Sequence, residues 1–183
     1  MFRLEASEIP GCYQVFPAVT RDERGTFVKV FHENAFRELG LETGFVESYY
    51  SVSRKDVIRG MHFQRPPQDH AKLVYCTDGA VLDVVVDLRK GSPTYGICAK
   101  FNLDAERGNM AYLPRGLGHG FLVRSERATL VYSVTSVYSP QYDEGIRWDS
   151  VGISWPVTEP IISDRDRGFP VFEYWDSPFR YVG

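Results

Sequence analysis

A stretch from Val57 to Tyr75, "VIRGMHFQRPPQDHAKLVY", gathers polar and basic side chains between two apolar runs. A histidine such as His62 can take up a proton near neutral pH, while Arg59 suits a phosphate and Lys72 an anionic oxygen. Polar groups that point into a β-rich interior need partners, so this crowding indicates a reactive site. The alternative is a hydrogen-bonded strand histidine flanked by solvated cations.

A metal centre would need a different spacing of ligands. Small β-barrels often hold a metal through a His-x-His pair, a following carboxylate and a distant third histidine. Here Phe63 and Gln64 follow His62, His70 lies eight residues further on, and His119 has no neighbouring ligand. We therefore predict no bound metal and favour acid–base chemistry by His62, with Lys72 close by across a hairpin and a carboxylate orienting the ring.

Short β-rich runs separated by turn residues must position these groups. Their spacing predicts an all-β sandwich or barrel. In "VLDVVVDLR", Asp83 and Asp87 share one face of a strand, and the opposite, valine-rich face is predicted to pack in the core. The predicted strands are "GCYQVFPAV", "GTFVKVF", "KLVYCT", "AVLDVVVDL", "YGICAKFNL", "NMAYLP", "HGFLVRS" and "ATLVYSVTSVY", with another ending in "HFQ".

Turn and helix signals divide these runs. The "TDGA" at 77–80 predicts a hairpin, and "LPRGLGHG" at 113–120 predicts a tight loop. A helix is predicted over "ENAFRELG" at 33–40, ended by Gly40, and a short one near "SDRDR". The remaining C-terminal residues predict an irregular tail that packs back on the sheet.

The whole chain limits the possible classes of protein. Its 183 residues fit one domain over 1–183, and a net charge of −3 gives no sign of a nucleic-acid surface. The N-terminus lacks a basic start with an apolar core, and no apolar run approaches the roughly 18 residues of a membrane span. We expect a cytoplasmic protein without a membrane partner, with Cys12, Cys76 and Cys98 as reduced, buried thiols.

Seven motifs in order give a more specific indication. The chain resembles the dTDP-4-dehydrorhamnose 3,5-epimerase family over nearly its whole length. The motifs are "RDERGTF" at 21–27, "SVSRKDVIRGMHFQRPP" at 51–67, "AKLV" at 71–74, "DVVVDLRKGSPTYG" at 83–96, "LPRGLGHGF" at 113–121, "VYSVTSVYSP" at 131–140 and "GISWP" followed by "ISDRD" at 152–166.

The resemblance implies a cupin-type jelly-roll β-barrel with a few short peripheral helices. It implies a site inside the barrel without metal or cofactor, and a homodimer in which an N-terminal strand crosses to the partner. It also implies that His62 is the catalytic base, oriented by Asp166, with Asp164 as a competing candidate. Tyr132 would be the acid on the opposite face of the sugar, and Lys72 would stabilise the enolate oxygen.

Substrate-binding positions follow from the same resemblance. His119 would lie near the sugar, the alternative being a turn histidine bonded to backbone. The diphosphate would meet Arg59, Arg165 and, from the partner chain, Arg24, while Tyr138 would stack on the nucleobase. Gln64 is read as a supporting polar wall residue, and His70 as solvent-facing or at the mouth of the site.

Two segments depart from the family pattern. The family commonly has Gln-Asp-Asn where this chain has Glu47, Ser48 and Tyr49, and glutamate two residues after Phe27, where this chain has Lys29. Both segments contact the nucleotide in the family. The preference for thymine is therefore the part of the prediction that rests on the fewest matching residues.

These residues predict an isomerase that inverts C3 and C5 of a nucleoside-diphosphate 4-keto-6-deoxy sugar. The predicted reaction converts dTDP-4-dehydro-6-deoxy-glucose to dTDP-4-dehydro-rhamnose. One alternative is a C3-only epimerase of a specialised deoxysugar pathway, acting on the same or another nucleotide base. Others are a catalytically silent sugar-nucleotide-binding cupin and a metal-dependent cupin oxygenase or isomerase.

Overall fold

Two facing β-sheets form the body of the protein. The computed structural model describes residues 2–183, in which strands far outnumber two short α-helices, and the all-β prediction is confirmed. The first sheet contains, in spatial order, β1 (Phe2–Ala6), β2 (Tyr13–Pro17), β10 (Met110–Leu113), β7 (Lys72–Asp78), β12 (Arg127–Val134) and β5 (Glu47–Arg54). The second contains β13 (Asp143–Gly145), β6 (Ile58–Gln64), β11 (Leu117–Val123), β8 (Ala80–Asp87) and β9 (Cys98–Asp104).

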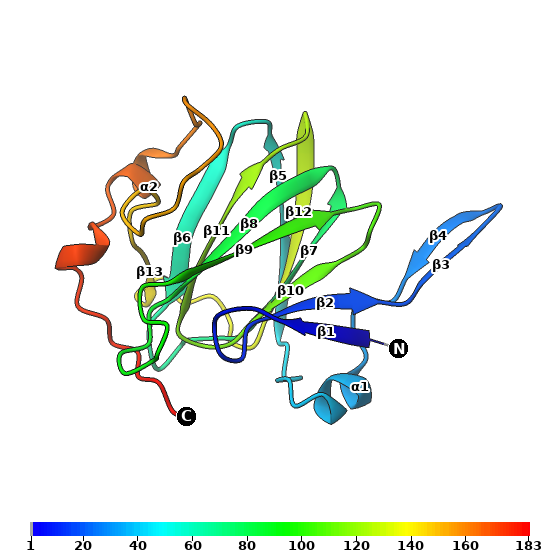
Figure 1. The fold of residues 1–183 in the computed structure, drawn as a ribbon, viewed down its shortest axis with the longest axis horizontal. Helices are drawn as coiled ribbons and strands as arrows, with labels where there is room; N and C mark the ends of the chain where they lie inside the picture. Colours follow the sequence, from blue (N-terminus) through cyan, green and yellow to red (C-terminus); the bar gives the residue numbers. More distant parts are fainter. Residues whose placement is uncertain (1) are drawn as a thin grey trace.

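A third pairing lies apart from this body. Strands β3 (Val19–Asp22) and β4 (Gly25–Val28) form an antiparallel hairpin that projects away from the two sheets (Figure 1). Its residues are exposed except at the base, where Val19 and Val28 are half-buried. The hairpin therefore has little of this chain to pack against.

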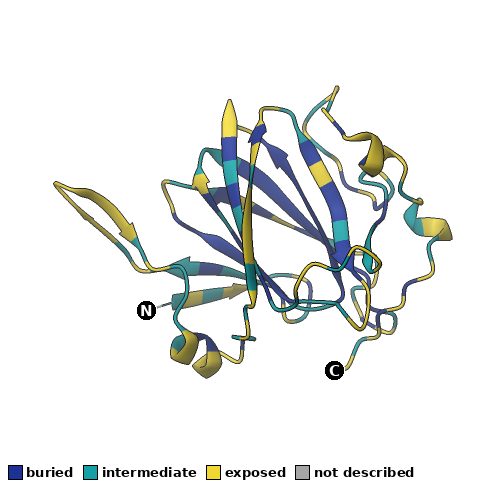
Figure 2. Cartoon of the chain, turned by 180° about the vertical axis from the view of Figure 1, so that it is seen from behind, coloured by how far each residue is buried: buried dark blue, intermediate teal, exposed yellow. Residues whose placement is uncertain are grey.

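Both faces of β8 are buried, and the prediction that its valine-rich face packs in the core is confirmed. Val84 and Val86 pack outward against the C-terminal tail, in a cluster that includes Ile146 and Phe179, so the predicted docking of the tail is confirmed. The opposite face, with Val85 and Asp83, points between the two sheets, where the main core lies. Figure 2 shows this buried interior as continuous dark blue along the central strands.

The Asp-Gly turn joins the two sheets and does not close a hairpin as predicted. β7 pairs with β10 and β12, whereas β8 pairs with β9 and β11. Gly79 adopts φ +74°, and a Cβ there would lie 2.0 Å from the carbonyl oxygen of Arg127. Only glycine fits at this corner, because a side chain would collide with the next strand.

Both helix predictions are confirmed. α1 (Glu33–Glu38) is followed by Gly40 at φ +73°, and α2 (Asp164–Arg167) begins after Ser163, whose hydroxyl accepts the amide of Asp166 at 3.1 Å. A 3₁₀ turn covers Phe172–Tyr174. Such an N-terminal hydroxyl cap satisfies a donor that the helix leaves unpaired.

Candidate active site

His62 and Asp166 form a hydrogen-bonded pair at the junction of β6 and α2. His62 Nε2 lies 2.8 Å from Asp166 Oδ1, and the Gly60 amide donates to the other carboxylate oxygen at 3.1 Å. Burial by itself raises the pKa of a carboxyl, but hydrogen bonds led by that of His62 outweigh it and lower the pKa of Asp166. The ionised carboxylate favours a proton on Nε2, which leaves the lone pair of Nδ1 as the basic atom. The competing Asp164 is exposed.

Close approach of β6 and β11 sets the position of His62. Gly60, at φ +149°, packs so tightly on β11 that a Cβ would lie 2.6 Å from the Cα of Gly120. His62 and His119 are register partners across this pair of strands. Two glycines therefore let the strands meet where the two imidazoles face the barrel interior.

Lys72 enters the same interior from the opposite sheet. It begins β7, is 6% exposed, and its ammonium donates to the carbonyl oxygen of His62 at 3.3 Å. The predicted nearness to His62 is confirmed, but the two residues face each other between sheets and not across a hairpin. Burial lowers the pKa of Lys72 to about 8, partly countered by Asp143 and Asp83.

Tyr132 completes the set from β12. Its side chain is buried, and its hydroxyl lies 3.2 Å from the Ser51 hydroxyl on the neighbouring strand β5. Burial raises the pKa of Tyr132 well above its usual value, so the phenol stays protonated at neutral pH. A protonated phenol in this position can donate a proton.

A second histidine and carboxylate pair lies beside the first. His119 Nε2 is 2.7 Å from Asp83 Oδ2, and both side chains are almost completely buried. Burial lowers the pKa of His119 in spite of the adjacent carboxylate. His119 lies within β11, which begins at Leu117, so the alternative of a turn histidine bonded to backbone is wrong. Asp83 is a site residue that sequence reasoning missed, because it was considered only with Asp87 as part of a strand face.

These side chains line neighbouring hollows. A cavity of about 190 Å³ is bordered by His62, Lys72, His119 and Tyr132, together with Arg59. His62 also borders a cavity of about 340 Å³ and a wider groove of about 860 Å³. The imidazole therefore stands where three hollows meet, and a bound molecule larger than a single sugar has room beside it.

The outer cavity has a polar rim. Glu47 accepts the backbone amide of Tyr138 at 2.6 Å, and Asp143 lies 2.7 Å from a guanidinium nitrogen of Arg165. Tyr138 is 59% exposed. Arg59 reaches the smaller cavity, with its Nε donating to Ser53 at 2.9 Å. Two guanidinium groups thus flank His62 from different elements.

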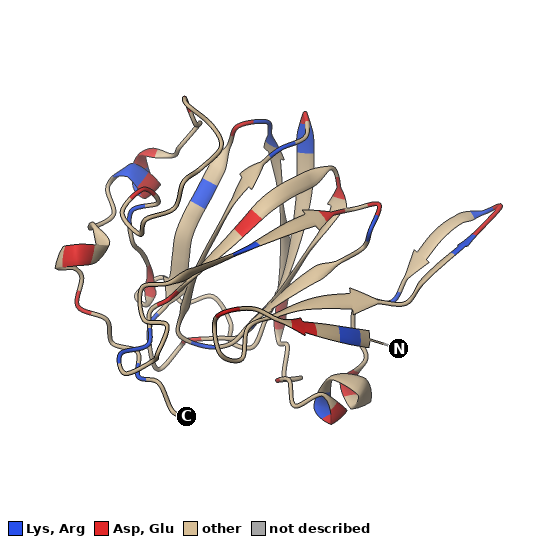
Figure 3. Ribbon diagram, viewed as in Figure 1, with Lys and Arg blue, Asp and Glu red and all other residues tan. Residues whose placement is uncertain are grey.

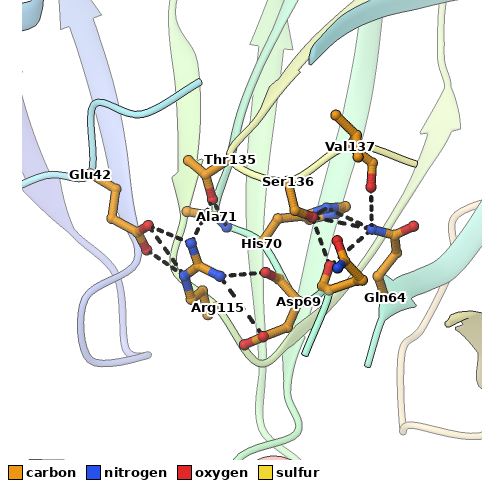
Figure 4. A network of polar contacts seen from close by, with 10 residues as sticks. Glu42, Gln64, Asp69, His70, Ala71, Arg115, Thr135, Ser136 and Val137 are labelled. Atoms are coloured by element: carbon orange, nitrogen blue, oxygen red, sulfur yellow. Dashed lines mark hydrogen bonds and ion pairs between the residues drawn. The ribbon is translucent and has the colours of Figure 1, made fainter. Parts of the chain in front are cut away.

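Gln64 and His70 both border the outer cavity. They belong to one network of polar contacts (Figure 4). The Gln64 amide donates to the carbonyl oxygens of Gln68 and Val137 at 2.9 and 3.2 Å, while His70 Nδ1 lies 3.0 Å from the Ser136 hydroxyl. Burial lowers the pKa of His70 to about 3, helped by the charge of Lys72. His70 is therefore at the mouth of the site and half-buried, and the solvent-facing alternative is wrong.

Three predicted binding residues lie away from the outer cavity of their own chain. Arg24, Phe27 and Lys29 lie on or just after the projecting hairpin and are all exposed. Arg24 pairs with Asp22 at the hairpin tip, and Phe27 is 64% exposed. In this chain Arg24 and Phe27 border a separate hollow of about 360 Å³.

Charged residues elsewhere gather mainly in loops and at strand ends, with basic and acidic positions within β6 and β8 (Figure 3). Among residues 2–183, no three His, Cys, Asp or Glu side chains converge as metal ligands. Cys12, Cys76 and Cys98 are free thiols; the first two are buried as predicted and the third is half-buried. No helix within this range is long and apolar enough to cross a membrane.

Comparison with known proteins identifies the family. The profile of the family described as dTDP-4-dehydrorhamnose 3,5-epimerase matches residues 6–174. The chain belongs to this family. An epimerase of that name from Shigella flexneri is 42% identical over 163 residues, which cover 87% of this chain and 90% of that protein. The family resemblance predicted from sequence motifs is therefore confirmed, and the chain is an enzyme of the epimerase family.

Solved relatives show the same architecture. A dTDP-6-deoxy-D-glucose-3,5-epimerase from Legionella pneumophila Philadelphia 1, crystallised with dTDP-4-keto-L-rhamnose, is 32% identical with a TM-score of 0.95. The alignment covers 100% of both chains. The predicted cupin-type jelly roll of the epimerase family is confirmed.

A dTDP-4-dehydrorhamnose 3-epimerase from Streptomyces niveus is 39% identical over 90% of this chain and 81% of that protein.

Proposed function

We propose that the enzyme epimerises C3 and C5 of a dTDP-linked 4-keto-6-deoxy sugar, converting dTDP-4-dehydro-6-deoxy-glucose to dTDP-4-dehydro-rhamnose. One observation carries the proposal. The base His62, the protonated phenol of Tyr132 and the ammonium of Lys72 border a single cavity of about 190 Å³. Inversion next to a ketone requires a base, an acid on the opposite face and a group that holds the enolate oxygen.

The base is His62, acting through Nδ1. It takes the proton from the carbon next to the ketone, and the electron pair of the broken C–H bond forms the enolate. Asp166, 2.8 Å from Nε2, stabilises the imidazolium that results. A hydrogen bond to a fixed carboxylate also keeps the ring in one orientation, which a catalytic base needs.

Lys72 and Tyr132 complete the reaction. The Lys72 ammonium is buried, and therefore stabilises the enolate oxygen more strongly than it could in water. Tyr132 then donates its proton to the face opposite His62 and regains one from solvent, while the His62 imidazolium releases its proton to solvent. Repetition of these steps at the second carbon gives the doubly inverted sugar. No cofactor is needed for this proton balance.

The nucleotide is proposed to occupy the outer hollows. Arg59 and Arg165 flank His62 and suit the diphosphate, while the exposed ring of Tyr138 suits stacking on the base beside Glu47. His119 is proposed to contact the sugar, and Gln64 to support the wall.

The remaining binding residues are proposed to come from a second copy of the chain. The exposed positions of Arg24, Phe27 and Lys29 on a projecting hairpin support a homodimer with N-terminal strand exchange. In that dimer, the hairpin of one protomer would reach the nucleotide of the other. We place this reaction in the cytoplasm.

A C3-only epimerase is the second candidate, supported by the 39% identity to a relative named as a 3-epimerase. Incubation of the 4-keto sugar nucleotide with the enzyme in deuterated water separates the two. Deuterium at both C3 and C5 of the product, read by NMR, is expected; deuterium at C3 alone would overturn double epimerisation. Competition by dTDP, UDP, CDP and GDP in the same assay tests the base, with dTDP expected to compete best.

A further inference from the structure

The ring of Tyr132 is stacked against a second tyrosine from the edge of the sheet. Tyr49 and Tyr132 are register partners on β5 and β12. Their ring centroids are 4.9 Å apart, and the ring planes differ by only 20°. Aromatic rings of cross-strand partners attract each other beyond the area that they bury.

The surroundings of Tyr132 leave its ring little freedom. The rings of His119 and Tyr132 meet in a T-shaped arrangement with centroids 5.9 Å apart, and the Tyr132 hydroxyl lies 3.2 Å from that of Ser51. Tyr49 covers one ring face and is itself 42% exposed, because β5 is the last strand of its sheet. It borders both the inner and the outer cavity, so the stack stands at the boundary between them.

We propose that Tyr49 is a positioning residue for proton return: its stacked ring holds Tyr132 with the hydroxyl beside Ser51, where it faces the inner cavity. This inference rests on the proposed function, in which Tyr132 is the acid. Tyr49 acts through its ring and not through its hydroxyl. Among the described residues, the Tyr49 hydroxyl has no hydrogen-bond partner within the cavity.

The proposal predicts a particular division of the reaction. Without the stack, Tyr132 samples other ring orientations, because rotation about its side-chain torsions χ1 and χ2 is no longer limited on the uncovered face. Proton removal by His62 does not depend on that ring. The enolate then persists for longer, and His62 returns a solvent-derived proton to the original face. Exchange therefore continues while inversion slows.

The experiment compares deuterium in recovered, uninverted substrate with deuterium in inverted product, at early times in deuterated water. At saturating substrate, Tyr49→Ala is expected to raise this ratio about tenfold. Tyr49→Phe, which keeps the ring, is expected to restore the wild-type ratio. Tyr174→Ala, which removes a tyrosine that is 80% exposed on the C-terminal tail, serves as the matched control.

A double variant gives the decisive comparison. If Tyr49 acts only through Tyr132, then Tyr49→Ala combined with Tyr132→Phe is expected to have the same ratio as Tyr132→Phe alone. An unchanged ratio in Tyr49→Ala, a defect shared by Tyr49→Phe, or additive defects in the double variant would each overturn the proposal. Failure of the proposed function looks different, because the wild type would then show no exchange at either carbon.

Discussion

Two histidine and carboxylate pairs lie side by side in this barrel, and they differ mainly in access. His62 with Asp166 and His119 with Asp83 have nearly equal separations, 2.8 and 2.7 Å, and the histidines are register partners. The His62 side chain is 28% exposed, whereas that of His119 is 4% exposed. Only the first imidazole opens onto all three hollows.

The carboxylates differ in the same sense. Both oxygens of Asp166 have partners, one of them the Gly60 amide, whereas Asp83 Oδ1 has no hydrogen-bond partner among the described residues. A carboxylate with satisfied oxygens at the end of an open hollow can stabilise a transient charge on its histidine. The comparison teaches that the chemical pair alone does not define a base, because access and solvation decide which pair can move a proton.

Replacement of the two histidines is expected to show the largest difference between the pairs. His62→Asn is expected to lower the rate of solvent exchange by about 10²–10⁴-fold, the range typical of a lost general base. His119→Asn should keep measurable exchange, with its main effect on KM. Exchange measured by NMR in deuterated water checks both variants, with circular dichroism to verify folding. Equal loss in the two variants would show that access does not distinguish them.

Replacement of the carboxylates should have the next largest effect. Asp166→Asn keeps the volume but removes the charge that favours the imidazolium, so kcat is expected to fall about 100-fold. Asp83→Asn should lower kcat much less, since in the proposed mechanism His119 removes no proton. Steady-state kinetics of the two purified variants test this order, and a larger loss in Asp83→Asn would reverse the assigned roles.

The pH dependence should report on Lys72, whose charge faces both pairs. Burial lowers its pKa to about 8, so the ammonium is present below that pH and lost above it. In the wild type, kcat/KM is expected to fall about tenfold per pH unit above pH 8. A pH profile in buffers of constant ionic strength measures this decline. A plateau up to pH 10 would contradict a lysine that works in its charged form with this pKa.

The charge on Lys72 should have its smallest effect on folding stability. There the pH dependence has the opposite sign, because stability rises with pH while kcat/KM falls. The unfolded chain keeps the Lys72 proton up to about pH 10.5 and the folded chain only up to about 8, so stability rises with pH between these values. Lys72→Met removes the cost of burying the charge and should raise the free energy of unfolding at pH 7 by up to about 3 kcal/mol. Urea unfolding measures this gain, with the exposed Lys100→Met as control. A loss of stability would contradict this prediction, because it would mean that contacts in the folded protein offset the cost of burying the charge.

The strand β5 shows why part of the fold could not be predicted from the sequence. Its outward face carries the exposed apolar residues Tyr50 and Val52, while its inward face carries Ser51 and Ser53. This reverses the usual pattern of a half-buried strand, because the inward face lines a cavity instead of a packed core. The three-residue β13 was missed for a simpler reason, since so short a segment has no periodicity.

The candidate site was predictable to the extent that its residues lie in motifs. His62, Lys72 and Tyr132 were selected by type and family resemblance, and the structure brings them to one cavity. Asp83 was missed because nothing local shows that its face of β8 points inward. Its pairing with His119 depends on the register of β8 and β11. The two residues are 36 positions apart in the sequence, and local spacing does not encode that register.

By itself, the sequence determined the β-rich architecture, the two short helices, the family and the residue types needed for proton transfer. These follow from local periodicity, turn chemistry and motifs, which act over a few residues. Only the tertiary structure decided that the Asp-Gly turn joins two sheets, that Lys72 faces His62 between them, and that one histidine is open while its neighbour is sealed. Access and solvation depend on contacts between distant segments, and such contacts exist only once the sheets have packed.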